Sequence, residues 1–270
     1  ACLHVEVALK GDVYGDTLVF ETWFKGKNTG RASVKINNLN TYVTVNLSEV
    51  HLWGPGEPNI YDINVWLYKD GQCFDSVKSY FGLRTVALSE NAILINGKPI
   101  FQRLVLDQGF YPGGVYTAPT DEDLRRDIEI SMGLGFNGAR LHEKVFEPRF
   151  LYWADMLGYI VWGEYANWGL DITTPMGLER FLPEWLEAVD RDFNHPSIIG
   201  WCPFNETWDE DGRKPDDEVL RIVYTVTKAI DKTRPVIDTS GNFHVVTDIF
   251  DIHDYDQDPQ SFAAKFEPMK

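Results

Sequence analysis

The period of the hydrophobic pattern changes once along the chain, and this change constrains the fold more than any other feature. Up to about Val86, runs such as TLVFETWF (17–24) and YDINVWLY (61–68) alternate apolar and polar residues and are separated by Gly, Asn and Asp. Such alternation is typical of antiparallel strands with one buried face. Because no helical stretch interrupts these short runs, we predict an immunoglobulin-like β-sandwich over residues 1–87.

From residue 88 on, apolar strand-like runs alternate with amphipathic helical patterns. Thr120 is expected to cap the first helix, DEDLRRDIEISMGLG, with Asp123 at the capping-box position. Further helices are predicted over 148–157, 178–193 and 216–230. Strands are predicted near residue 100 and over 136–141, 159–162, 198–202, 235–238 and 249–253. Because each helix carries the chain back across the sheet, the strands of such a βα repeat are parallel.

The residues that follow the predicted strands favour a TIM barrel over an open doubly wound sheet. A Rossmann-type sheet has a Gly-rich phosphate turn after its first strand, whereas RLVLDQGFYPGG (103–114) contains neither Gly-x-Gly-x-x-Gly nor a P-loop. Polar and aromatic residues instead follow one strand after another, as in a barrel whose site lies at the C-terminal ends of its strands. These residues are Arg103, Asp107, Arg140, His142, Glu164, Trp168, Asn205, Glu206, His253 and Tyr255.

The number of predicted strands is smaller than a closed barrel of this type requires. Six strands are predicted from residue 95 on, whereas a TIM barrel has eight. We therefore expect residues 88–270 to form a (β/α)8 TIM barrel truncated after about six strands, and the chain to be a piece of a longer protein. The predicted fold class is multidomain, a β domain followed by an α/β domain.

Composition argues against several classes of partner. The 41 acidic and 25 basic residues give a formal net charge of -16, which repels phosphate backbones and anionic membrane surfaces. Neither nucleic acid nor a membrane is expected as a partner, and no apolar run is long enough to span a bilayer. No signal peptide is visible at the start of the sequence, so the compartment is left open with a slight preference for the cytoplasm.

Cysteine and histidine usage predicts no metal site. Cys2, Cys73 and Cys202 are widely spaced and show no CxxC or Cys/His pattern, so neither a disulfide framework nor a zinc site is indicated. The remaining histidines outside the strand ends, among them His51, His195 and His244, are interpreted as structural. His195 belongs to the Asn-His-Pro-Ser turn between a helix and a strand, where an imidazole can bond locally.

Glu206 lies in the most informative segment, IIGWCPFNETW (198–208). Its carboxyl follows an apolar strand and stands between Phe204 and Trp208. Burial against aromatic rings raises the pKa of a carboxyl and keeps it protonated near neutrality, so that it can act as an acid. Such a group could protonate a glycosidic oxygen. The alternative is that Glu206 caps the following segment or pairs with an arginine.

Several segments resemble those of glycoside hydrolase family 2, which includes β-galactosidases, β-glucuronidases and β-mannosidases. NHPSIIGWCPFNETW (194–208) is similar to the HPSII-W-x-x-x-NE segment of this family. LGYIVWGE (157–164), NGAR (137–140) and INGKPIFQR (95–103) resemble other parts of the family barrel. LWGPGEPNIYDINVWL and FGLRTV resemble the signatures of its immunoglobulin-like domain. The resemblance covers nearly the whole chain and implies a retaining, exo-acting β-glycosidase for terminal β-linked sugars, of the β-galactosidase or β-glucuronidase type.

The resemblance also implies roles for individual residues. Glu206 falls on the general acid/base of the family, and Asn205 on the residue that holds the sugar 2-hydroxyl, a bond that strengthens in the transition state. Arg140 matches the arginine that holds the charge of the nucleophile. The nucleophilic glutamate of the family lies at the end of the seventh barrel strand, so we expect it to be absent from this chain and the isolated chain to be inactive.

The other strand-end residues are candidates for substrate binding. Arg103 and Asp107 follow the first barrel strand, where relatives bind the terminal sugar, although QRLVLDQG departs from the family's Asn-Arg-His pattern. His253 stands where similar enzymes place a substrate-facing histidine, and Glu164 matches a third-strand glutamate that is not the nucleophile. The complete set of candidates is Asn205, Arg103, Asp107, Arg140, His142, Glu164, Trp168, Trp208, His253 and Tyr255. For His142 and the two tryptophans, a place in the core is an equal alternative.

A carbohydrate is the expected partner, and the formation of a homo-oligomer is left open. No cofactor is expected, because the Mg²⁺ or Na⁺ that some family members use is not supported by residues in this sequence. Two other functions remain as alternatives, a non-catalytic carbohydrate-binding protein or pseudoenzyme and an endo-glucanase-like barrel hydrolase. The predicted sandwich before the barrel argues against the endo-glucanase. Which sugar is bound is not determined by these residues.

Overall fold

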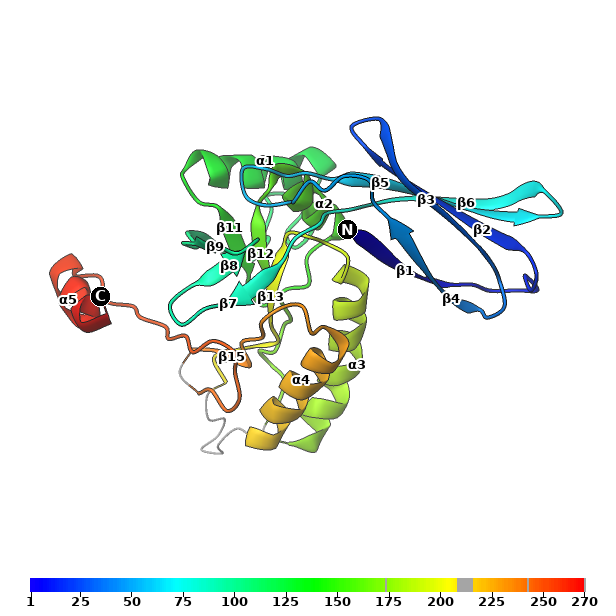
Figure 1. The fold of residues 1–270 in the computed structure, drawn as a ribbon. Coiled ribbons are helices and arrows are strands. Elements are labelled where there is room, and N and C mark those ends of the chain that lie inside the picture. Colours follow the sequence, from blue (N-terminus) through cyan, green and yellow to red (C-terminus); the bar gives the residue numbers. More distant parts are fainter. Residues whose placement is uncertain (173, 208–215, 242, 270) are drawn as a thin grey trace. The chain divides into compact units, whose positions relative to one another are not determined.

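The computed structural model describes residues 1–172, 174–207, 216–241 and 243–269 of the 270-residue chain (Figure 1). The chain divides into two compact units, which are described separately. The first unit comprises Ala1–Arg140, Phe146–Val161 and Arg191–Ile199, and the second comprises Leu141–Val145, Trp162–Asp190 and Gly200–Lys270. The domain boundary predicted at residue 87 stays a prediction.

Antiparallel strands form the N-terminal part of the first unit, drawn in blue and cyan in Figure 1. These strands are β1 (Cys2–Ala8), β2 (Thr17–Phe24), β3 (Lys27–Lys35), β4 (Asn40–Asn46), β5 (Tyr61–Lys69) and β6 (Gln72–Phe81). One sheet has the order β3-β2-β5-β6 and the other pairs β1 with β4. Leu18, Phe20, Val45 and Tyr61 belong to the core of this region, and Leu3 and Val5 pack against it. The predicted β-sandwich is confirmed.

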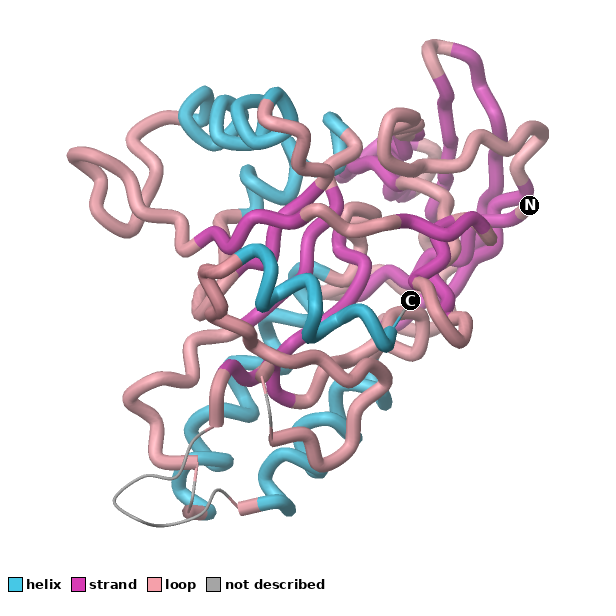
Figure 2. The backbone as a smooth tube through the Cα atoms, turned by 90° about the vertical axis from the view of Figure 1, so that its left-hand side faces the viewer, coloured by secondary structure: helices cyan, strands magenta, loops and turns pink. Residues whose placement is uncertain are grey.

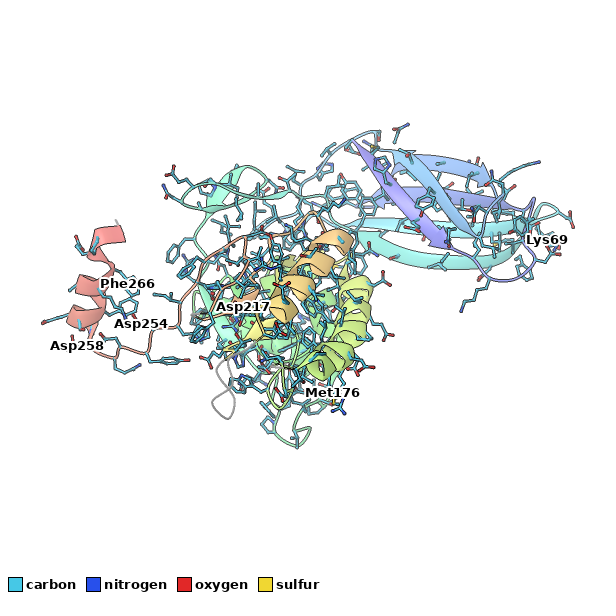
Figure 3. All side chains as sticks on the ribbon, turned by 90° about the horizontal axis from the view of Figure 1, so that it is seen from below. Lys69, Met176, Asp217, Asp254, Asp258 and Phe266 are labelled. Carbon is cyan, nitrogen blue, oxygen red and sulfur yellow. The ribbon has the colours of Figure 1, made fainter. Side chains whose placement is uncertain are left out.

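The Asp70-Gly71 turn shows why this part of the sequence forms hairpins. Lys69, labelled in Figure 3, pairs with Gln72, so the loop between β5 and β6 has two residues. Asp70 has φ 50° and Gly71 has φ 80°, which is the geometry of a tight turn whose twist matches that of the flanking strands. The Asp-Gly pair therefore forms the hairpin turn between β5 and β6.

A second small sheet follows the sandwich within the first unit. It consists of β7 (Val86–Leu88), β8 (Ile93–Ile95) and β9 (Lys98–Ile100), in that order and antiparallel. Asn96 and Gly97 form the turn between β8 and β9, both with positive φ. The start of INGKPIFQR therefore forms a hairpin.

The βα part of the chain forms a four-stranded parallel sheet with the order β10-β11-β12-β13. Its strands are β10 (Leu104–Asp107), β11 (Gly138–Leu141), β12 (Ile160–Glu164) and β13 (Ile198–Cys202). Between them along the chain lie α1 (Asp121–Gly133), α2 (Pro148–Leu157) and α3 (Pro175–Asp192), so that strands and helices alternate. Figure 2 draws the helices in cyan and the strands in magenta. The predicted βα order is confirmed, and α2 and β13 have the predicted bounds.

Local capping explains where two of the helices begin. The side chain of Thr120 accepts a hydrogen bond from the backbone N–H of Asp123 at the start of α1, as predicted. Asp216 caps α4 (Asp217–Ile230) by accepting from the N–H of Glu218. In the second unit α4 lies beside α3 (Figure 1), and Trp185 Nε1 of α3 donates to Thr227 Oγ1 of α4 at 2.8 Å.

Within the second unit, β12 and β13 pack through reciprocal tryptophan–glycine contacts. A Cβ atom added to Gly200 would lie 2.2 Å from the ring of Trp162, and one added to Gly163 would lie 2.6 Å from the ring of Trp201. Each tryptophan therefore fills the space that the missing side chain on the neighbouring strand leaves. Both tryptophans are buried. Trp162 and Trp201 therefore belong to the core and are not exposed for stacking on a sugar.

The last two predicted strands are largely wrong. Residues 235–238 contribute a single parallel bridge, Trp201 to Val236, and a strand of two residues follows as β15 (Thr239–Ser240), which pairs with β14 (Phe204–Asn205). Residues 249–253, all of them described, form no strand. The reason is that side chains replace strand neighbours: Asp248 accepts from the N–H of Val236, Thr247 Oγ1 from that of Ile249, and His244 Nε2 from that of Asp251. Beyond these residues, Asp258 caps the short helix α5 (Pro259–Phe266) (Figure 3).

A buried carboxylate, Asp155 of α2, connects distant segments of the first unit. It accepts hydrogen bonds from Tyr80 Oη at 2.8 Å and from the backbone N–H of Ser197 at 2.9 Å, and its Oδ2 lies 2.6 Å from His195 Nδ1. Trp53 Nε1 donates to the carbonyl of Asp155 at 2.7 Å. The interpretation of His195 as structural is consistent with this position.

Among the residues with described placement, no helix is long and apolar enough to cross a membrane.

Candidate active site

The second unit brings most of the predicted site residues into one hydrogen-bonded region at the ends of its strands. Glu164 ends β12, and Asn205 ends β14 with Glu206 next to it. His253 and Tyr255 come from the segment that follows the 243–251 loop. Trp208 lies outside the described residues.

Glu206 has an unusual backbone conformation. Its φ is 46°, in the left-handed region that a residue other than glycine adopts at a cost of roughly 1 kcal/mol or more. The pairing of β14 with β15 continues through this residue, because the N–H of Glu206 donates to the carbonyl of Ser240 at 2.9 Å. Gly241 lies against the Glu206 side chain and has φ 125°. The surrounding backbone therefore holds Glu206 in a conformation that the residue would not adopt by itself.

The Glu206 side chain is 14% exposed and makes two short contacts through one oxygen. Tyr255 Oη donates to Oε1 at 2.6 Å, and His253 Nδ1 lies 2.6 Å from the same atom. The Tyr255 residue is 73% exposed, so its hydroxyl is bonded to the carboxyl from the solvent side. These two contacts of Glu206 are therefore made by an imidazole and a phenol.

His253 continues the network behind Glu206. Its Nε2 lies 2.9 Å from Ser240 Oγ, and this hydroxyl donates to Asp251 Oδ2 at 2.6 Å. The backbone N–H of Gly241 donates to Asp251 Oδ1 at 3.2 Å. Ser240 and Asp251 were not predicted as site residues, because nothing in the spacing of SGNFHVVTDIFDIH indicates that the chain returns on itself there.

The loop that carries His253 is held by the buried pair of His244 and Asp238. His244 Nδ1 lies 2.7 Å from Asp238 Oδ1, and Nε2 lies 2.8 Å from the carbonyl of Asp251. Burial acts to lower the pKa of His244, but the hydrogen bonds and charges of Asp238 and Asp251 outweigh it and raise the pKa above its usual value. This geometry supports the interpretation of His244 as structural.

Asn205 is buried, and its backbone is fixed by a residue that the sequence did not single out. Asn167 Oδ1 accepts from the N–H of Asn205 at 2.7 Å, and Asn167 Nδ2 donates to the carbonyl of Asn205 at 3.1 Å. The Asn167 side chain therefore takes the place of a neighbouring strand. Its position three residues after the end of β12 is the signal that could have identified it.

A second missed residue, Glu143, orders the loop after β12. Its Oε2 accepts from the backbone N–H groups of Asn167 and Trp168, at 2.9 and 3.0 Å. The N–H of Glu143 in turn donates to Glu164 Oε2 at 3.1 Å, and Glu143 has φ 53°. Glu164, which is 3% exposed, thus contributes to a chain of contacts that ends at Asn205.

His142 and Trp168 are in contact with each other in the second unit. Their rings meet edge to face with centroids 5.4 Å apart. His142 is buried, whereas Trp168 is 57% exposed. The alternatives for each residue were substrate binding and a place in the core. His142 has the burial of a core residue. Trp168 has the exposure that stacking on a sugar requires.

Three predicted residues belong to the first unit. Arg103 Nε donates to the carbonyl of Gly135 at 2.9 Å, and the N–H of Arg103 donates to Asn137 Oδ1. Asp107, at the end of β10, accepts from the N–H of Gly109 at 2.8 Å. Arg140 is half-buried on β11. The catalytic or binding roles of these residues stay predictions.

Across the described ranges of the chain, no group of three or more His, Cys, Asp or Glu side chains is arranged to hold a metal ion. The held carboxyl of Glu206 can take part in proton transfer, and the polar groups around it can bind a polar ligand through hydrogen bonds.

Comparison with known proteins agrees with the geometry. Residues 4–84 match the family model of glycosyl hydrolases family 2, and residues 86–269 match the model of the TIM barrel domain of that family. The chain is 30% identical over 258 residues to β-galactosidase 2 of Enterobacter cloacae, an alignment that covers 87% of this chain and 24% of the relative. It is 31% identical over 179 residues to β-glucuronidase of Mus musculus, covering 60% of this chain and 26% of the relative.

A solved structure shows the same fold. The crystal structure of an FMN-binding β-glucuronidase from Facaelibacterium prausnitzii superimposes with a TM-score of 0.75 at 23% identity, covering 82% of this chain and 34% of that chain. This chain spans about a quarter of the length of the curated relatives it matches. The chain belongs to glycosyl hydrolases family 2 and contains part of the family's TIM barrel domain.

Proposed function

We propose that the chain is part of a retaining, exo-acting β-glycosidase that hydrolyses terminal β-linked sugars of the β-galactosidase or β-glucuronidase type. Glu206 is its general acid/base. The observation that carries this proposal is the position of Glu206, a largely buried carboxyl in a left-handed conformation directly after a strand, with Tyr255 and His253 on one oxygen. Strained residues of this kind cluster at functional sites.

The acid step needs a carboxyl whose direction is fixed before the substrate arrives. The Glu206 proton passes to the glycosidic oxygen as the bond between that oxygen and the anomeric carbon breaks, and the carboxylate later takes a proton from the attacking water. Because Oε1 is engaged by Tyr255 and His253, the plane of the carboxyl group is set by the protein. This restriction reduces the entropy lost on reaching the transition state.

Asn205 is proposed to hold the 2-hydroxyl of the sugar. The support is its burial and the double contact of its backbone with Asn167, which fixes the position of the side chain beside Glu206. A hydrogen bond to the 2-hydroxyl contributes most in the oxocarbenium-like transition state. Trp168 is proposed as a stacking platform because its ring is exposed next to this loop.

The second carboxylate of a retaining mechanism lies about 5 Å from the first and acts as the nucleophile. We propose that the nucleophile belongs to a part of the whole protein that this chain does not include. The support is that the chain spans about a quarter of its curated relatives. The 270-residue chain is then expected to show no turnover by itself.

The test is a panel of aryl and alkyl β-glycosides assayed with the whole protein and with its Glu206→Ala variant. General acid catalysis contributes roughly 10²- to 10⁴-fold, so the variant is expected to lose about that factor with alkyl glycosides. With a 2,4-dinitrophenyl glycoside the first step needs no acid, and added azide is expected to replace water and restore turnover. Full activity of Glu206→Ala on alkyl glycosides would contradict the assignment. Binding of sugar without turnover in the whole protein would favour the carbohydrate-binding alternative.

A further inference from the structure

Both ring nitrogens of His253 already have partners inside the protein. Nδ1 lies 2.6 Å from Glu206 Oε1, and Nε2 lies 2.9 Å from Ser240 Oγ. An imidazole offers two hydrogen-bonding nitrogens, so neither is left for a sugar hydroxyl unless one of these contacts is broken. The substrate-facing role that the resemblance implies for His253 does not account for this geometry.

The direction of each hydrogen bond in this network follows from the donors that the groups possess. An ionised carboxylate only accepts, so the single hydroxyl proton of Ser240 points to Asp251 Oδ2, 2.6 Å away. Ser240 Oγ must then accept from His253, which places a proton on Nε2. The neutral tautomer fixed in this way leaves Nδ1 as the basic nitrogen. One proton therefore lies in the 2.6 Å contact between Nδ1 and Glu206 Oε1.

We propose that Asp251, Ser240 and His253 form a relay that orients the carboxyl of Glu206 through a proton held between Nδ1 and Oε1, so that His253 is a positioning residue for the acid/base and not a sugar contact. This inference rests on the proposed function of Glu206. Tyr255 is a second donor to the same oxygen. Both contacts are made to Oε1 of Glu206.

The chemistry of the two steps explains why such a relay is useful. The proton that passes to the departing oxygen is carried on Oε2 of Glu206, and the other proton, in the contact between Nδ1 and Oε1, stays in place and stabilises the carboxylate that is left in a largely buried position. In the second step the carboxylate accepts a proton from water as the bond between water oxygen and anomeric carbon forms.

The kinetic test uses one sugar with two leaving groups. In the whole protein, His253→Ala is expected to lower kcat/KM for the alkyl glycoside by roughly 10- to 10²-fold, the range for a misplaced catalytic group, with an effect of less than about 3-fold on the 2,4-dinitrophenyl glycoside. A sugar contact or a merely structural histidine would lower both values equally, because the two substrates carry the same sugar. An equal loss would overturn the proposal.

Two further variants make the test specific. The amide nitrogen of His253→Asn reaches the place of Nδ1 and is expected to recover most of the alkyl-glycoside activity, whereas His253→Gln reaches toward Ser240 and is not. His253→Ala added to Glu206→Ala is expected to cause no further loss, because the relay acts through Glu206. If kcat/KM of the double variant is lower than that of Glu206→Ala by the factor that His253→Ala causes alone, His253 acts independently and the relay is wrong. If Glu206→Ala by itself shows no dependence on the leaving group, the proposed function falls, and the relay with it.

The hydrogen bonds can be tested in the 270-residue chain without any turnover. An imidazole proton in a 2.6 Å contact with a carboxylate gives a proton resonance far downfield in the NMR spectrum. We expect such a signal for His253 and expect it to disappear in both His253→Asn and Glu206→Gln, while His244→Asn removes a different one. Retention of the His253 signal in Glu206→Gln would show that the imidazole bonds elsewhere and would overturn the relay.

Discussion

Two short carboxylate–imidazole contacts, one in each unit, have the same length, but their carboxylate residues differ in burial and in backbone conformation. Asp155 and His195 in the first unit, and Glu206 and His253 in the second, both approach to 2.6 Å. Asp155 is fully buried on a regular helix and also binds Tyr80 and the backbone of Ser197. Glu206 is partly exposed and sits in a left-handed conformation. The comparison teaches that the contact alone does not distinguish the buried pair from the pair proposed to be catalytic, and that backbone conformation and access from solvent are the features that differ between them.

The largest difference between the two pairs is expected in stability. Asp155→Ala removes the acceptor of several buried donors and is expected to lower the free energy of unfolding by about 3–5 kcal/mol, the range for breaking a buried ion pair or network. Glu206→Gln removes a charge from a strained, partly exposed position and is expected to change stability by less than about 1 kcal/mol. Urea unfolding of the 270-residue chain measures both.

The comparison would fail if Glu206→Gln lowered the free energy of unfolding as much as Asp155→Ala or more. A Glu206→Gln variant that unfolds as easily as Asp155→Ala would mean that Glu206 is a structural carboxylate like its counterpart in the first unit. Tyr80→Phe serves as a milder control in the first unit, because it removes one donor to Asp155 and leaves the other contacts in place.

The next largest effect is expected at Asn167, which supports the site without belonging to either pair. Asn167→Ala leaves the backbone N–H and carbonyl of Asn205 without this partner, and each lost partner of a buried group costs roughly 1–3 kcal/mol. Asn167→Asp keeps the acceptor for the N–H but cannot donate to the carbonyl, so its loss is expected to be about half as large. Thermal unfolding measures stability, and kcat of the whole protein reports the displacement of Asn205. Equal stability of both variants and the parent would show that the contacts with Asn205 are not important.

Glu206 itself allows the strain in the second pair to be measured. Glycine adopts positive φ without a steric cost, whereas alanine does not. Glu206→Gly is therefore expected to be more stable than Glu206→Ala by about 0.5–1 kcal/mol, although both lack the carboxyl. The same comparison at Asp155, which lies in α2, is expected to have the opposite sign, because glycine destabilises a helix interior by about 1 kcal/mol relative to alanine. A difference of the same sign at both positions would contradict the assigned strain.

The first part of this fold was predictable from sequence because its signals are local. The period-two runs, the Asp70-Gly71 turn and the cap at Thr120 each depend on residues within a few positions of one another. Residues 249–253 have the composition of a strand but form none, and side chains accept from two of their backbone donors: the N–H of Ile249 donates to Thr247 Oγ1, and the N–H of Asp251 donates to His244 Nε2. Local pattern carries no information on such contacts.

The candidate site shows the same limit more clearly. Glu206 and Asn205 could be identified from one segment, because the Asn-Glu pair follows an apolar strand. The partners that hold them could not, since Asn167 lies 38 residues from Asn205 and His253 lies 47 residues from Glu206. The left-handed backbone of Glu206 was equally hidden, because glycine or asparagine, and not glutamate, is the residue that signals positive φ.

A third carboxylate–imidazole pair, His244 with Asp238, is expected to have the smallest effect on the free energy of unfolding. Burial acts to lower the pKa of His244, but Asp238 and Asp251 outweigh burial and raise it above the usual value of 6.5. A histidine whose pKa is raised by folding contributes stability that is fully present below the pKa of the unfolded chain and is lost as the pH rises through the folded pKa. The free energy of unfolding should therefore contain a component that declines above about pH 6.5 and that His244→Asn removes. The Asp238 carboxylate also accepts hydrogen bonds from backbone N–H groups of Thr239, Val245 and Val246. The His244→Asn variant is therefore expected to keep the loop in place. A pH profile of unfolding that is the same in His244→Asn and the parent would show that this imidazole is not charged in the folded chain.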